Sequence, residues 1–225
     1  RVHQVRLHIV EFRGFEKFVQ GRPFWELPVM VQRLCGICPV SHHLAAAKAL
    51  DIIVGATRLT PTAEKIRRLM HYGQILQSHA LHFFHLSSPD LLFGFESDVA
   101  RRNIVGIAAA YPDVAKQGVL LRKYGQEVIR HTAGKRIHGT GSVPGGVNKN
   151  LAPEERAALL ADVDQMISWS RAAVRLVLDA AQVVRAVHHF SGAGTVTSAT
   201  PIIASRVTIF ASCSSLQPSV PAGRT

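Results

Sequence analysis

The spacing of apolar residues along the chain predicts a mainly α protein with a small N-terminal β portion. Apolar and polar residues alternate over positions 2–12, which is the period of a half-buried strand. From about position 23 onward, apolar residues instead recur at intervals of three and four, which places them on one face of a helix. The pattern therefore favours a helical domain that begins with one strand.

Prolines, glycines and polar caps divide the helical part into segments. The strongest predicted helix covers 60–84, where Thr60 caps a proline-led first turn and an apolar stripe runs for about six turns. Positions 138–148 contain four glycines but no Gly-Lys-Ser/Thr ending, so a structural loop is favoured over a phosphate-binding one. Further helices are expected over 15–19, 23–34, 44–54, 99–110, 114–131 and 153–188.

The composition changes after position 190. Residues 1–190 are predicted to form one domain. Residues 191–225 are rich in Ser, Thr, Ala, Pro and Gly, contain no acidic residue and show no sustained period. We expect this segment to be a poorly ordered tail, or sequence unrelated to the domain before it. The chain also begins at Arg1, inside the predicted strand, which we interpret as the sign of a truncated sequence.

Composition and charge narrow the class of protein. Apolar residues make up 47% of the chain, which is ample for a core, but no uninterrupted apolar run is long enough to predict a membrane span. The net charge of +11 comes from dispersed basic residues without interleaved aromatics, so nucleic-acid binding is not expected. Three cysteines, only two of them clustered, do not form a secreted disulfide framework. A cytoplasmic location fits better.

The candidate chemistry begins at Cys35 and Cys38, which Gly36 and Ile37 separate and which two histidines closely follow. Thiolates at this spacing can bind one soft metal ion or form a redox disulfide.

Four interpretations compete on the residues alone. A zinc knuckle needs a fourth ligand at position 48, which is Lys48. A thioredoxin-like redox pair needs a strand before Cys35, where the pattern predicts a helix. Two buried core cysteines are common in general, but less so around a glycine with histidines adjacent. The last interpretation is a metal site completed by residues outside the cluster.

A second group of histidines is a weaker candidate. His79, His82 and His85 lie on the strongest predicted helix at intervals of three. Steps of three residues drift around a helix, so the outer two cannot both point where His82 points. We therefore do not nominate them as metal ligands.

At this point the sequence resembles a known family. The Arg-x-Cys-Gly-x-Cys-x3-His motif at 33–42 is similar to the N-terminal metal-binding signature of nickel-iron hydrogenase large subunits, and 12–18 matches the Arg-Gly-x-Glu element that precedes it. The resemblance covers about 1–188 and implies a partial large-subunit fold, a bundle of long helices. Segments 23–26 and 41–43 are most similar to the cytoplasmic, NAD-reducing (bidirectional) group.

The resemblance implies a role for each motif residue. Cys35 would be a terminal nickel ligand, and Cys38 would bridge nickel to an iron that carries carbon monoxide and cyanide. His42 would lie next to the ligands and tune them. Glu16 would help bind a magnesium or similar divalent ion. The residues expected to take part in catalysis are thus Cys35 and Cys38.

The implied activity is reversible heterolytic cleavage of dihydrogen. Electrons would pass to iron-sulfur clusters in a hydrogenase small subunit, and then to flavin and NAD in diaphorase subunits. Iron-sulfur clusters, flavin and NAD are thus expected only in partners.

The chain also departs from the family pattern. The family's second Cys-x-x-Cys has no match, and Cys213 stands alone, so we expect an N-terminal fragment that holds half of the metal ligands and is inactive by itself. The alternative functions are a non-catalytic relative of the quinone-site subunit of complex I, and a thioredoxin-like redox protein. The complex I relatives lack the cysteine pair that Cys35 and Cys38 provide.

Overall fold

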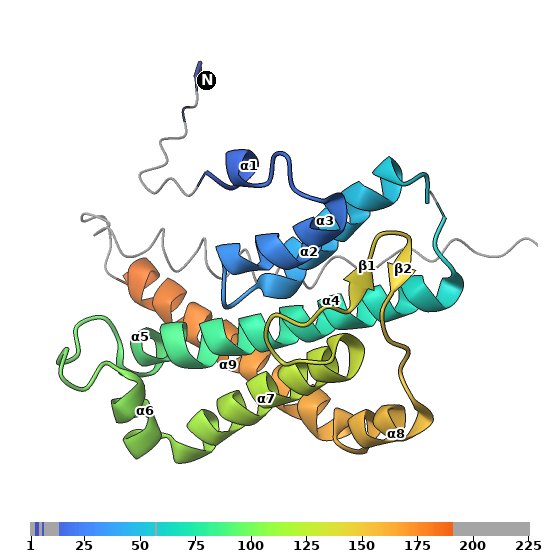
Figure 1. The fold of residues 1–225 in the computed structure, drawn as a ribbon. Helices are drawn as coiled ribbons and strands as arrows, with labels where there is room; N and C mark the ends of the chain where they lie inside the picture. Colours follow the sequence, from blue (N-terminus) through green and yellow to red (C-terminus); the bar gives the residue numbers. More distant parts are fainter. Residues whose placement is uncertain (1–2, 5, 7–13, 57, 191–225) are drawn as a thin grey trace, which may run out of the picture.

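The computed structural model describes residues 3–4, 6, 14–56 and 58–190, and helices dominate this part of the chain (Figure 1). The mainly helical class predicted from the sequence is confirmed, and a small two-stranded sheet accompanies the helices. The strand expected over 2–12 falls almost entirely outside the described residues, as does the segment 191–225. Within the described part, no helix is both long and apolar enough to cross a membrane.

Short helical turns lead into the first long helix. The single helix predicted over 23–34 is wrong: this stretch consists of two 3₁₀ turns around one α turn. Pro28 explains the break, because it has no N–H to continue the preceding turn and instead lies in the first turn of a new one. The elements are α1 (Phe15–Phe18), η1 (Phe24–Glu26), α2 (Leu27–Met30), η2 (Val31–Leu34) and α3 (Pro39–Ile53).

Two long helices, α4 (Pro61–Leu81) and α7 (Pro112–Ala133), pack side by side at the centre of the molecule (Figure 1). Thr60 caps α4 as predicted, with its hydroxyl oxygen accepting the N–H of Ala63 at 3.2 Å. The helices approach closely because glycines face each other. A Cβ on Gly125 would lie 2.7 Å from the backbone nitrogen of Gln77.

The helix predicted over 60–84 continues beyond α4 in a different form. Residues His82–Ser87 form a six-residue π-helix, η3, before α5 (Ser88–Phe93) and α6 (Ile104–Ala110). The π-helix places both Phe83 and Phe84 in the core, against Leu121 and Met166. A second core cluster, nearer the cysteines, contains Val40, Met70, Ile129 and Ala133.

The glycine-rich segment forms a small antiparallel hairpin rather than an open loop. Strand β1 (Ser142–Val143) pairs with β2 (Gly146–Val147), with Ser142 opposite Val147. Two helices follow, α8 (Pro153–Ala161) and α9 (Val163–Phe190), where the sequence predicted one. The break falls at Asp162.

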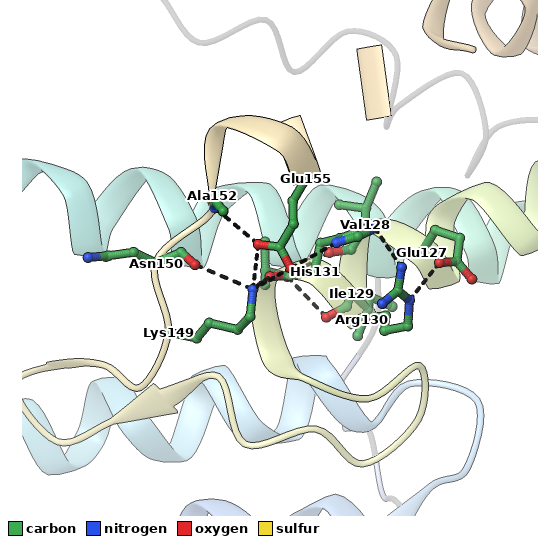
Figure 2. Close-up of polar contacts among 10 residues, drawn as sticks. Glu127, Val128, Ile129, Arg130, His131, Lys149, Asn150, Ala152 and Glu155 are labelled. Carbon is green, nitrogen blue, oxygen red and sulfur yellow. Dashed lines mark hydrogen bonds and ion pairs between the residues drawn. The ribbon is translucent and has the colours of Figure 1, made fainter. Parts of the chain in front are cut away.

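A polar network joins the end of α7 to the start of α8 (Figure 2). Lys149 donates hydrogen bonds from Nζ to the Glu155 carboxylate at 2.6 Å and to the carbonyl of His131 at 2.8 Å. The backbone N–H of Ala152 donates to Glu155 at 3.0 Å, which caps α8. The Lys149 hydrogen bond, followed by those from Ala152 and His131, lowers the pKa of Glu155 to about 2.

Candidate metal centre

Cys35 and Cys38 lie in a tight loop between η2 and α3. Cys35 has an extended backbone, and Pro39 begins α3 directly after Cys38. The N–H groups of Ile37 and Cys38 donate to the sulfur of Cys35 at 3.3 and 3.4 Å. The two cysteines are reduced and half-buried. The loop therefore wraps its own backbone around the Cys35 sulfur and leaves both residues partly exposed.

The two thiols influence each other electrostatically. Burial, followed by the hydrogen bond and the charge of Cys35, raises the pKa of Cys38 to about 11. Two thiolates this close repel each other, so a cation between them would favour the charged form of both. This donor set fits a soft metal such as nickel or iron, and it supplies two of the ligands that such a centre needs.

His42 lies beside the cysteines, whereas His43 faces the core. The Nε2 atom of His42 is 3.6 Å from the Cys38 sulfur. His43 is only 1% exposed; its Nδ1 pairs with the carbonyl of Pro28 at 2.8 Å, and its Nε2 accepts the N–H of Ser142 at 2.9 Å. Burial lowers the pKa of His43, so a neutral ring joins α2 to the hairpin. Of the histidine pair, His42 is thus the member that contacts a cysteine.

A buried ion pair holds the hairpin close to this region. Arg67 on α4 donates to both carboxylate oxygens of Asp51 on α3, at 2.6 and 3.1 Å. The same guanidinium donates to the carbonyls of Val143 and Gly146 at 2.7 and 2.9 Å, and the N–H of Gly145 donates to Asp51 at 2.7 Å. The glycine-rich segment is thus bound by structural contacts, as the sequence predicted.

The remaining predicted site residues lie elsewhere. Glu16 is exposed on α1, and Cys213 falls outside the described residues. The Nδ1 atom of His79 pairs with the carbonyl of Ile75 at 2.9 Å, and that of His82 lies 3.5 Å from the Ser87 hydroxyl. Among the residues that the structure describes, no three His, Cys, Asp or Glu side chains are grouped to hold a metal ion. The histidines of this helix thus do not form a metal-binding face there.

Sequence reasoning missed two buried glutamines on α4 that contact the cysteine loop. Gln74 and Gln77 both donate from their side-chain amides to the carbonyl of Ile37, at 2.9 and 2.5 Å. They are 2% and 3% exposed. The available signal was their spacing of three residues along the strongest predicted helix, where they share its apolar face with Met70.

Comparison with known proteins identifies the class. A family profile described as nickel-dependent hydrogenase matches residues 13–93, which include the cysteine loop. The beta subunit of the NAD-reducing hydrogenase HoxS of Cupriavidus necator is 52% identical over 197 residues, which are 83% of this chain and 40% of the relative. A vhu subunit of the F420-non-reducing hydrogenase of Methanocaldococcus jannaschii is 50% identical over 173 residues, covering 77% of this chain and 41% of the relative.

Solved structures agree. An NAD⁺-reducing [NiFe]-hydrogenase in the H2-reduced state superposes with a TM-score of 0.75 and 66% identity, covering 78% of this chain and 39% of that chain. The Ni-Fe-Se hydrogenase from D. vulgaris Hildenborough gives a TM-score of 0.65 at 26% identity, covering 76% of this chain and 37% of that chain.

The chain therefore belongs to the nickel-dependent hydrogenase family, and its fold is part of the large-subunit fold. Within that family it is similar to NAD-reducing members. It spans about 40% of the length of the curated relatives that it matches. The thioredoxin-like and complex I alternatives are not favoured.

Proposed function

We propose that this chain is part of the catalytic large subunit of a nickel-iron hydrogenase, which cleaves dihydrogen reversibly and passes the electrons to iron-sulfur clusters of a small subunit. One observation carries the proposal. Cys35 and Cys38 occupy a single loop inside the family-matched region, with the Cys38 N–H 3.4 Å from the Cys35 sulfur and His42 3.6 Å from the Cys38 sulfur. Soft ligands in such a loop suit nickel and iron.

The proposed roles follow the residues of the loop. Cys35 would be a terminal nickel ligand, and Cys38 would bridge nickel and iron. When bound, the nickel-iron centre supplies the Lewis acidity and redox chemistry that heterolytic cleavage of dihydrogen requires. The backbone N–H groups of Ile37 and Cys38 stabilise negative charge on the Cys35 sulfur. His42, through Nε2, orients the sulfur of Cys38.

Further features are proposed from the same family likeness. Carbon monoxide and cyanide would be ligands of the iron, and Glu16, whose side chain is exposed on α1, would bind magnesium or a similar ion. Residues 1–190 would form the hydrogenase part. Similarity to NAD-reducing hydrogenases supports NAD as the final acceptor, reached through flavin in diaphorase subunits, and a cytoplasmic location. Because the loop offers two thiolates, the chain alone would not catalyse the reaction.

The test uses the assembled hydrogenase that contains this chain. We expect Cys35→Ser and Cys38→Ser each to lose nickel, measured by elemental analysis, and to lose hydrogen-dependent NAD reduction. Cys213→Ser is the matched control, because Cys213 has no assigned ligand role, and it should retain both. Nickel content and activity equal to those of the unmodified enzyme in Cys35→Ser would refute the ligand assignment.

A further inference from the structure

The peptide group between Ile37 and Cys38 is held from outside the loop. Its carbonyl oxygen accepts hydrogen bonds from Gln74 Nε2 at 2.9 Å and from Gln77 Nε2 at 2.5 Å. Both glutamines come from α4, the central helix, and both are almost fully buried. The Ile37 side chain, in contrast, is 45% exposed. The main chain rather than the side chain therefore fixes this residue.

The same peptide group carries the N–H that donates to the Cys35 sulfur. In a trans peptide the C=O and the following N–H point in opposite directions, and none of the described peptide bonds is cis. Holding the Ile37 oxygen against α4 thus aims the Cys38 N–H away from α4, toward the Cys35 sulfur 3.4 Å away. The two glutamines determine the direction of a hydrogen bond that they do not themselves make.

Packing behind the glutamines restricts their position. The backbone nitrogen and Cβ of Gln77 lie within 2.8 Å of where a Cβ on Gly125 would be, so α7 supports Gln77 from behind. Within the described part of the chain, Gln74 Oε1 is buried and has no hydrogen-bond partner. Its amide therefore gives up one favourable contact while donating to Ile37. Unsatisfied buried polar atoms of this kind are uncommon and call for an explanation.

We propose that Gln74 and Gln77 are positioning residues for the metal ligand Cys35. By clamping the Ile37 carbonyl they maintain the N–H to sulfur hydrogen bond, which draws electron density from the thiolate and so raises the reduction potential of the bound metal. The part that concerns the metal rests on the proposed function. The clamp on the peptide group does not.

The first measurement is amide hydrogen exchange in the assembled hydrogenase that contains this chain. Gln74→Met and Gln77→Met keep the length of the side chain and remove its donor. In the double variant, we expect exchange at the Ile37 and Cys38 amides to become about tenfold faster, with a smaller change in each single variant. Leu121→Ala, which opens a cavity in the other core cluster, is the control for general destabilisation and should leave these amides unchanged.

The second measurement is the midpoint potential of the nickel signal, followed by electron paramagnetic resonance. The potential should fall in the double variant and stay unchanged in Leu121→Ala. Unchanged exchange, or an equal increase in the control, would overturn the clamp, and faster exchange with an unchanged potential would overturn the effect on the metal. Lack of nickel in the unmodified enzyme would instead count against the proposed function, while the exchange data would still decide on the clamp.

Discussion

Arg67 is the residue that joins several elements near the cysteine loop. It contacts Asp51 on α3 and carbonyls of both hairpin strands, and the side chains of the ion pair are 10% and 9% exposed. Replacing it would leave the Asp51 carboxylate buried without its partner. We expect Arg67→Met to lower the free energy of unfolding by about 3–5 kcal/mol in urea denaturation.

The adjacent arginine provides the control. Arg68 pairs with Glu64 at 3.3 Å, but the two side chains are 58% and 64% exposed. Water screens such a pair, so Arg68→Met should change the free energy of unfolding by less than about 1 kcal/mol. Equal losses in both variants would contradict the role given to Arg67.

The same ion pair predicts a pH dependence. Burial alone would raise the pKa of Asp51, but the hydrogen bonds from Arg67 and Gly145 and the Arg67 charge lower it below its usual 3.8. As the pH falls below about 4, the unfolded chain takes up a proton at Asp51 before the folded chain does, so the stabilisation is lost. The stability difference between the unmodified chain and Asp51→Asn should therefore shrink from pH 6 to pH 3 in urea unfolding. A constant difference would refute it.

At this scale the sequence revealed the cysteines but not their surroundings. The spacing of Cys35 and Cys38 is local, and thiols at that spacing have few other uses. Gln74 and Gln77 contact Ile37 across 37 and 40 residues of sequence. Only the packing of α4 against the loop brings them together, so the clamp could not be predicted from spacing alone.

Among the elements, the contact between α4 and α7 depends on small residues. A Cβ on Gly125 would come within 2.7 Å of the Gln77 nitrogen and 2.8 Å of the Gly73 carbonyl oxygen. Backbone atoms cannot move aside without separating the helices. We expect Gly125→Ala to destabilise the chain by about 1–3 kcal/mol in thermal or urea unfolding. Gly146→Ala is the control, since nothing lies within 4 Å of its Cβ position, and a comparable loss there would contradict this account.

Helix starts were more predictable than helix continuity. Thr60 and Pro61 form a local start signal, and α4 begins there. The π-helix His82–Ser87 has no such signal, because what favours it is the burial of Phe83 and Phe84 against other helices. The break at Asp162 was likewise missed. Tertiary packing, rather than local preference, determines these features.

For the whole molecule, the family follows from two short motifs and its fold from comparison with longer relatives. The chain covers about 40% of the length of those relatives, and its cysteine loop offers two thiols. The central claim is that these two thiols hold nickel together with ligands from elsewhere in the protein.

X-ray absorption at the nickel edge tests that claim most directly. In the assembled hydrogenase that contains this chain, the unmodified enzyme should show nickel surrounded by sulfur. Any nickel retained after Cys35→Ser should show a smaller sulfur contribution, partly replaced by oxygen or nitrogen. A nickel spectrum identical in the two proteins, at equal nickel content, would contradict the assignment of Cys35 as a ligand.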